Sequence, residues 1–310
     1  MKKLAFICQA GLDSFIHDIK NNLSNDYETN LYLVQSKEEI QEAVEWGDIL
    51  WYEWANDVAA YGTRLSKIKP DEQKIIVRLH SYEALSGMAK NLHWKSVDAC
   101  IFVAGHVKEL MTRQILAFDE ITKSYIIHNG INLNRFEFTE KEKGNNIAFL
   151  ALISNKKGPM LLIHAFNWLS KQGDYELHIG GQIQEQRYNL YMGQIIRELG
   201  ISEKVKFYGQ VKNVNEWFKD KHFIINTSPW EGCPVGLLEA MACGLKPLIH
   251  NFPGAKYLFP KKWIWNDFID VINMVEGDYK PKEYRKFVEK NFSLEKQMKE
   301  IVKVLKELEG

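Results

Sequence analysis

Short apolar runs alternate with amphipathic stretches along most of this 310-residue chain. The stretches between the runs, such as 38–46 and 106–115, place apolar residues at helical spacing. Strands that alternate with helices indicate βαβ units and a parallel sheet. The runs expected to form strands are 3–8, 29–34, 48–54, 74–80, 98–104 and 124–130 in the first half, and 147–153, 175–181, 204–209, 222–228 and 246–251 in the second.

The strand and helix pattern restarts after the polar stretch 138–146, so the chain reads as two α/β sets of similar size. A length of 310 residues is comfortable for two domains. Ligands of open parallel sheets bind at the carboxyl ends of the strands. We therefore expect two doubly wound, Rossmann-like domains and a ligand site in a cleft between them.

Composition removes several classes of function. The formal net charge is zero and the pI is about 7.1, which does not favour nucleic acid as a partner. No run approaches the roughly eighteen apolar residues of a membrane helix, and the first fifteen residues fit a strand better than a signal peptide. The cysteines are scattered and predict neither a zinc site nor a disulfide framework, so a reducing cytoplasm is expected. They are Cys8, Cys100, Cys233 and Cys243.

Residues 231–244, EGCPVGLLEAMACG, hold the most informative motif. An apolar strand runs into this glycine-containing loop, and the loop runs into a helix that should begin near Pro234. The free N–H groups of such a helix end bind phosphate. Glu239 inside the helix suits the vicinal hydroxyls of a ribose, and Glu231 on the loop suits another polyol. Phosphate flanked by hydroxyls describes a nucleotide sugar. On spacing alone, a surface glutamate and a helix glutamate that complements the dipole are equally good explanations, and the glycine-rich setting favours function.

The motif is similar to the E-x7-E motif of the retaining family 4 glycosyltransferases, which have the GT-B fold. Further stretches resemble the same family over most of residues 126–300, whereas residues 1–125 resemble it mainly in architecture. These stretches are 126–136, 154–166, 178–182, 205–211 and the tail KFVEKNFSLEKQM. The resemblance implies two Rossmann-like domains that face a central cleft, with a C-terminal helix that crosses back. The expected domains are 1–128 with 287–310, on the acceptor side, and 129–286, which binds the nucleotide sugar.

The resemblance also implies roles for residues of the donor site. Glu239 would bind the ribose, Glu231 the sugar hydroxyls, and Lys157 the diphosphate. The backbone N–H groups of Cys233 to Gly236 would line the sugar and phosphates. Where the family usually has an arginine five residues before this lysine, the chain has Leu152. The full set of expected donor-binding residues is Gly11, Gly181, Gln210, Gly232, Cys233, Pro234, Val235, Gly236 and Glu239.

Residues expected to act beside the donor lie in the first half of the chain. His80 ends a strand where the family often has a histidine near the reacting sugar, although a lone histidine is more often structural. It joins Glu231 and Lys157 as an expected catalytic residue. Packing in the core is the more common role for tryptophans such as Trp54. The expected acceptor-side residues are Glu53, Trp54, Arg78 and Ser81.

The expected reaction is transfer of a hexose from a nucleoside diphosphate sugar to a hydroxyl of a glycan or glycoconjugate, as in polysaccharide biosynthesis. Among such donors, a UDP-sugar is expected. The resemblance implies retention at the anomeric carbon, no enzymic nucleophile, and no metal or other cofactor. The chain also contains no D-x-D motif. Residues 1–128 hold more acidic than basic side chains, so membrane contact should be weak or transient. A cytoplasmic enzyme, at most peripheral at the inner membrane face, is expected.

Two other functions remain open for a chain of this kind. A GT-B epimerase would use one sugar nucleotide and no acceptor. A non-enzymatic nucleotide-sugar-binding or scaffold protein is suggested by Leu152, since one phosphate-binding cation is missing. Chemistry that depends on NAD is disfavoured, because no G-x-G-x-x-G follows any expected strand.

Overall fold

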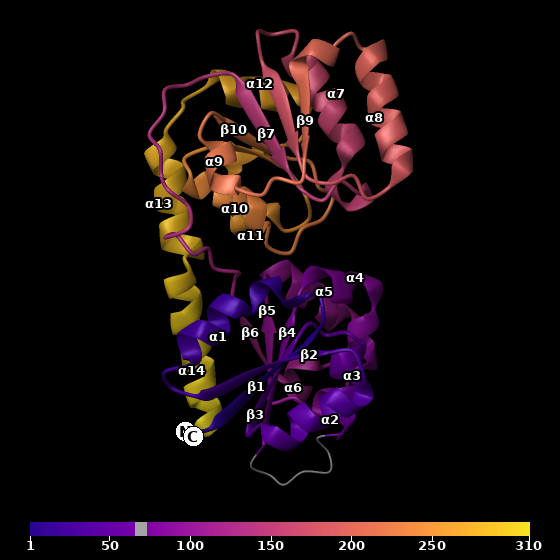
Figure 1. Ribbon diagram of the computed structural model, residues 1–310, viewed down its shortest axis with the longest axis vertical. Coiled ribbons are helices and arrows are strands. Elements are labelled where there is room, and N and C mark those ends of the chain that lie inside the picture. The colour runs from indigo at the N-terminus through magenta and orange to yellow at the C-terminus, as the bar shows by residue number, and fades with distance from the viewer. Residues whose placement is uncertain (66–72) are drawn as a thin grey trace. The chain divides into compact units, whose positions relative to one another are not determined.

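A computed structural model describes residues 1–65 and 73–310 as two compact units (Figure 1). The first unit contains Met1–Gly130 and Leu294–Gly310, and the second contains Ile131–Ser293. From the sequence, the chain was expected to return to the first domain at residue 287. In the structure it returns at Leu294, and residues 287–293 belong to the second unit. Within the described residues, no helix combines the length and apolarity needed to cross a membrane.

The first unit is built on a parallel sheet with strand order β2-β1-β3-β4-β5-β6. Its strands are β1 (Lys3–Gln9), β2 (Glu28–Val34), β3 (Ile49–Glu53), β4 (Lys74–Leu79), β5 (Ala99–Phe102) and β6 (Lys123–Ile126). Its helices are α1 (His17–Leu23), α2 (Lys37–Trp46), α3 (Asp57–Leu65), α4 (Ser81–Ser86), α5 (Gly105–Gln114), α6 (Phe118–Ile121) and α14 (Leu294–Glu309). Every residue of β3 is buried, as expected for a central strand covered on both faces.

The second unit has a parallel sheet with order β9-β8-β7-β10-β11-β12. Its strands are β7 (Asn146–Leu150), β8 (Glu176–Gly180), β9 (Val205–Gly209), β10 (Phe223–Asn226), β11 (Lys246–His250) and β12 (Ile264–Trp265). Its helices are α7 (Pro159–Leu169), α8 (Gln186–Glu198), α9 (Val214–Phe218), α10 (Val235–Ala242), α11 (Ala255–Leu258), α12 (Phe268–Glu276) and α13 (Pro281–Phe292). In chain order these strands follow the 3-2-1-4-5-6 arrangement of dinucleotide-binding sheets.

The last helix completes the core of the first unit, although it follows the whole second unit in the chain. Met298, Ile301, Val304 and Leu305 of α14 are buried in one cluster with residues of β1, β3 and α1. In Figure 1, α14 runs beside α1 in the first unit. The structure therefore has the two Rossmann-like units and the returning C-terminal helix that the resemblance implies.

Candidate functional site

The second sheet has its topological switch point between β7 and β10. Strand order reverses there, and in open parallel sheets the crevice outside the carboxyl ends of the strands at such a point is where ligands bind. The loop after β7 carries Lys157, and the loop after β10 carries Glu231. Two residues that are 74 positions apart in the sequence are thereby brought to one place.

Lys157 and Glu231 form an ion pair at this switch point. Lys157 Nζ lies 2.6 Å from Glu231 Oε1. The hydroxyl of Ser228 lies 2.6 Å from the same carboxylate oxygen. The Lys157 side chain is 32% exposed and that of Glu231 is 11% exposed, so the pair lies at the surface of the crevice and the lysine is the more accessible partner.

The loop after β7 is fixed to the end of β10 by a side-chain hydrogen bond and by a close approach of the two backbones. Thr227 Oγ1 donates to the carbonyl of Lys157 at 2.8 Å. Gly158 has φ +61°, and a Cβ there would lie 2.2 Å from the carbonyl oxygen of Thr227. Only glycine fits this close approach, so the backbone next to Lys157 is held in one position.

Helix α10 begins at Val235, as the motif predicts, and Gly244 beyond its end has φ +92°. Gly236 leaves open space near the first turn, since a Cβ there would make only ordinary contact with the Leu150 carbonyl. The expected run of amide donors from Cys233 to Gly236 needs one correction. Pro234 carries no N–H, so it shapes the entry to the helix and its neighbours provide the donors.

Glu239 lies in the second turn of α10 and is partly buried. Burial raises the pKa of its carboxyl to about 7. Within the described parts of the chain, no hydrogen bond or ion pair engages this carboxyl. A buried carboxyl without a protein donor is costly to ionise. It is suited to accept hydrogen bonds from a ligand.

Leu152 lies just beyond β7 and is 51% exposed. This is the position where the resembling family usually has an arginine. Its exposed apolar side chain supplies no charge, so Lys157 is the cation that the structure places on Glu231 in this crevice.

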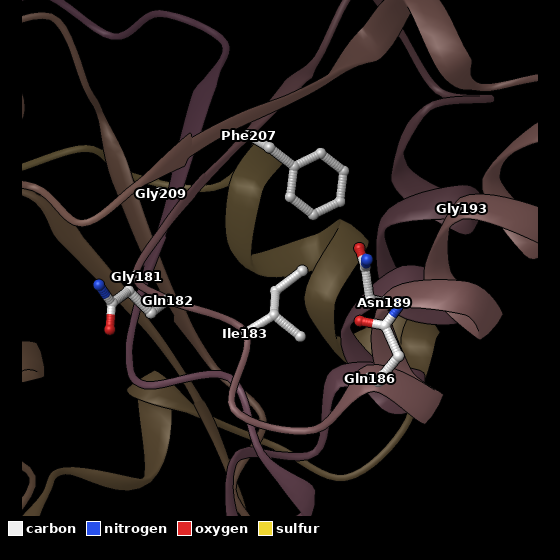
Figure 2. Close-up of a pocket in the computed structure, with 8 residues that line it drawn as sticks. All are labelled: Gly181, Gln182, Ile183, Gln186, Asn189, Gly193, Phe207 and Gly209. Carbon is white, nitrogen blue, oxygen red and sulfur yellow. The ribbon is translucent and has the colours of Figure 1, made fainter.

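Gly181 follows β8 and lines a pocket of about 520 Å³ together with Gly209, the last residue of β9 (Figure 2). Gln210 is the next residue in the chain. Gly181 has φ +124°, and a Cβ there would lie 1.8 Å from the carbonyl oxygen of Ala151. Gln182 Nε2 lies 3.3 Å from Gln210 Oε1, which links the two loops. In Figure 2, Ile183 and the ring of Phe207 point into the pocket, with Gln186 and Asn189 of α8 on its other side. The lining side chains are uncharged, so the pocket suits a neutral ring better than a phosphate.

The first sheet has its switch point between β1 and β3. Gly11 follows β1 with φ +86° and is exposed. Trp54 follows β3 with φ +79°, and its Nε1 donates to the carbonyl of Leu12 at 2.8 Å. A bulky residue with positive φ is strained by about 1–3 kcal/mol, and strain of this kind is typical of functional sites.

Glu53, Arg78 and His80 form a buried network at the ends of β3 and β4. Glu53 Oε1 lies 2.9 Å from Arg78 Nη1 and 2.8 Å from His80 Nε2. Burial opposes ionisation of Glu53, but the charge of Arg78 and the hydrogen bond from His80 outweigh it and hold the pKa of this carboxyl below its usual range. The indole of Trp54 stacks on His80 with ring centroids 4.0 Å apart. Glu53 and Arg78 are each 1% exposed, so direct contact with an acceptor would require them to leave this network.

Two other residues of this region have clear places. Ser81 begins α4 and is partly exposed. Glu83, one turn further, accepts from the backbone N–H groups of His80 and Ala55 and so ties the loops after β3 and β4 together. The structure brings His80, Glu53, Arg78 and Trp54 into one cluster, whereas Ser81 adjoins it along the chain.

Sequence reasoning did not single out Ser228 or Thr227. Ser228 precedes Glu231 by three residues, and S-x-x-E is the spacing of a helix capping box. That spacing was a usable signal, but here the two side chains bond to one another at the end of a strand. The contact of Thr227 with Lys157 depends on strand order, which a local pattern does not reveal.

Three comparisons relate the chain to known proteins. Residues 131–262 match the family described as glycosyl transferases group 1. A capsular polysaccharide biosynthesis glycosyltransferase, CapH of Staphylococcus aureus, is 23% identical over 138 residues, which are 44% of this chain and 39% of that protein. The match therefore spans about two fifths of that relative's own length.

Solved structures resemble the chain over nearly its whole length. HepE of Anabaena in complex with UDP and glucose has a TM-score of 0.79 at 17% identity, over 99% of this chain and 100% of that one. Sucrose-phosphate synthase of Thermosynechococcus elongatus has a TM-score of 0.78 at 13% identity, over 99% of each chain. At these identities the likeness establishes the fold.

Proposed function

We propose that this chain, whose residues 131–262 match the group 1 glycosyltransferase family within a GT-B fold, transfers a hexose from a UDP-sugar to a hydroxyl of a glycan or glycoconjugate. Retention at the anomeric carbon is part of the proposal. Two relatives support this choice of donor and pathway. The Anabaena protein was solved with UDP-glucose, and the Staphylococcus protein is named for capsular polysaccharide biosynthesis.

The carboxyl of Glu239 is the observation that carries the proposal. It is raised in pKa by burial alone and is engaged by no other described side chain. The paired hydroxyls of a ribose would donate to it and would stabilise its ionised form. Gly181 and Gln210, beside the uncharged pocket, would then meet the nucleotide on the same edge of the sheet.

Lys157 and the amides at the start of α10 would hold the diphosphate. An ammonium group and a helix N-terminus both favour the negative charge that grows on the leaving group. These groups would supply this stabilisation without a metal ion. The Lys157 side chain is flexible and partly exposed, so it can turn from Glu231 toward a phosphate.

Glu231 would bind hydroxyls of the transferred sugar and would not attack its anomeric carbon. Its Oε1 already accepts from Lys157 and Ser228, which lowers its nucleophilicity. The acceptor hydroxyl would attack the anomeric carbon from the same face of the sugar ring as the one from which the diphosphate departs. The departing phosphate would take the proton of that hydroxyl. A covalent glycosyl adduct on Glu231, detected by mass spectrometry of the intact protein, would contradict this assignment.

For Gly11 and His80 of the first unit we keep the roles that the resemblance implies, and we revise the acceptor side, because Glu53 and Arg78 are buried. Gly11 would approach the donor, and His80 would act near the reacting sugar. Trp54 and Ser81, both partly exposed, would contact the acceptor, and Glu53 and Arg78 would support His80 from within the unit. A cytoplasmic protein with at most weak membrane contact fits the acidic excess of this half.

The test is a thermal-shift and turnover experiment with UDP, GDP, ADP and CDP and their common sugars. UDP and one UDP-sugar should raise the melting temperature of the wild type, and Glu239→Ala should abolish the shift. Glu198→Ala, an exposed change on α8, is the control. Release of UDP in the presence of a glycan acceptor, undiminished by EDTA, would support transfer, whereas conversion of the sugar nucleotide alone would indicate an epimerase.

The exposed Leu152 favours one second candidate, a protein that binds nucleotide sugars without turnover. Such a protein would show the thermal shift but no release of UDP with any acceptor. Turnover of the wild type separates the two functions, and Leu152→Arg tests the cause. A restored cation should raise an existing rate, or should start UDP release if its absence is what prevents turnover.

A further inference from the structure

Ser228 lies at the carboxyl end of β10, between the strand and the loop that carries Glu231. It is 1% exposed, and its carbonyl oxygen lies 3.2 Å from His250 Nδ1. Its hydroxyl lies 2.6 Å from Glu231 Oε1. A short, buried side chain is thus in direct contact with the carboxylate that the proposed function places on the sugar.

The direction of this hydrogen bond follows from the chemistry of the two groups. An ionised carboxylate only accepts, so the serine hydroxyl donates. Asn226 Nδ2 lies 3.4 Å from Ser228 Oγ, which fits an oxygen whose hydrogen is turned toward Glu231. Lys157 Nζ donates to the same Oε1 at 2.6 Å. Two donors on one oxygen fix the rotation of the Glu231 carboxylate.

The two donors differ in how firmly they are held. Lys157 has a long side chain that is 32% exposed, whereas Ser228 has a short side chain and is 1% exposed, so it has less room to move. A diphosphate in the crevice would compete with Glu231 for the ammonium of Lys157. Charge-assisted bonds to phosphate are strong, so the lysine would be shared or withdrawn. The serine would then be the donor that stays on Oε1.

We propose that Ser228 is a positioning residue, which keeps the Glu231 carboxylate aimed at the sugar hydroxyls while the diphosphate of the donor draws on Lys157. This inference rests on the proposed function and assigns a role that the E-x7-E motif does not include. It makes a distinctive prediction, because UDP has the phosphates without the sugar. Loss of the serine hydroxyl should weaken binding of the sugar nucleotide much more than binding of UDP.

The experiment is isothermal titration of the full-length chain with UDP, UDP-glucose, UDP-galactose and UDP-N-acetylglucosamine. For the sugar nucleotide that the wild type binds best, Ser228→Ala should lose affinity by about tenfold, the value of a hydrogen bond to a charged group. For UDP the loss should be less than about threefold. Glu231→Gln should show the same selective pattern.

Two further variants separate positioning from folding. Ser170→Ala removes a hydroxyl that bonds to the Asn167 carbonyl in the same unit, and it should leave both affinities unchanged. Ser228→Cys keeps nearly the same volume with a weaker donor, so its selective loss should lie between those of the wild type and Ser228→Ala. If Ser228→Ala does not fold by circular dichroism, the cysteine variant gives the deciding comparison.

Equal losses for UDP and the sugar nucleotide, or no loss for either, would overturn the role of Ser228. If the wild type binds every UDP-sugar no more tightly than UDP, the role of Ser228 is overturned as well, because Glu231 would then not contribute to binding of the sugar. A wild type that binds none of the four nucleotides would instead refute the proposed function itself. The failures are therefore distinguishable.

Discussion

Replacing Glu239 by glutamine should stabilise the protein at pH 8 and weaken its binding of the donor. Burial raises the pKa of this carboxyl from 4.5 to about 7. Between these values the folded state binds more protons than the unfolded state, so the free energy of unfolding falls as the pH rises from about 4.5 to about 7. Each pKa unit corresponds to about 1.4 kcal/mol, so the ionised carboxylate costs up to about 3 kcal/mol.

The assay is urea unfolding of the wild type and Glu239→Gln at pH 4.5 and pH 8. Glutamine has the shape of the protonated acid and no charge. The two proteins should therefore be equally stable at pH 4.5, and the variant should be more stable by up to about 3 kcal/mol at pH 8. Glu198→Gln, on the exposed face of α8, should change stability by less than about 0.5 kcal/mol at both values.

Donor binding gives an independent measure of the same proton. Ribose hydroxyls favour the ionised carboxyl, so binding near pH 6.5 should release a proton and the affinity for UDP-glucose should rise from pH 6 to pH 8. UDP-glucose is the suitable probe because both of its phosphates are esterified, so neither titrates in this range. The terminal phosphate of UDP does titrate near neutral pH. Titration in buffers of different ionisation enthalpy counts the protons. An equal stability difference at pH 4.5 and pH 8, or binding without proton release, would refute the reasoning.

The remaining predictions concern the crevice, the backbone and buried charges. Lys157→Ala should weaken UDP binding by about tenfold or more, whereas the adjacent Lys156→Ala should change it by less than about threefold, as measured by titration; equal effects would contradict the assignment. Gly181→Ala should destabilise the protein by more than about 2 kcal/mol in urea, because its Cβ would meet the Ala151 carbonyl at 1.8 Å, while Gly200→Ala, with φ +67° and open space, should cost about 1 kcal/mol. Similar costs would show that positive φ alone matters. Glu53→Ala should cost about 3–5 kcal/mol, because it leaves Arg78 charged and buried, and a neutral result would mean that Arg78 reaches solvent. Burial lowers the pKa of His178 to about 4, so stability should be lost as the pH falls from about 6.5 toward 4, and His178→Gln should remove up to about 3 kcal/mol of that loss; an unchanged pH profile would count against a buried neutral imidazole.

Much of the fold is encoded locally. The apolar runs predicted every strand of both sheets except β12, because a strand buried on both faces needs a short, continuous apolar segment. The helices 57–65 and 268–276 were not identified, since DVAAYGTRL has a glycine and few large apolar residues, and 268–276 follows a two-residue strand. The strand, loop and helix around Glu231 and Glu239 could be predicted because they are consecutive in the chain. The roles given to those residues remain proposals.

Strand order and depth of burial were decided only by the tertiary structure. The contact between Lys157 and Glu231 exists because β7 pairs directly with β10, although β8 and β9 lie between them in the sequence. No local pattern specifies which strands become neighbours. The same holds for Glu53, which reads as a polar residue between aromatics but is enclosed by Arg78 and His80 from the next strand. The left-handed backbone of Trp54 also has no signal in its residue type. Periodicity is a property of neighbouring residues, whereas pairing partners, desolvation and strain arise only when distant segments pack together.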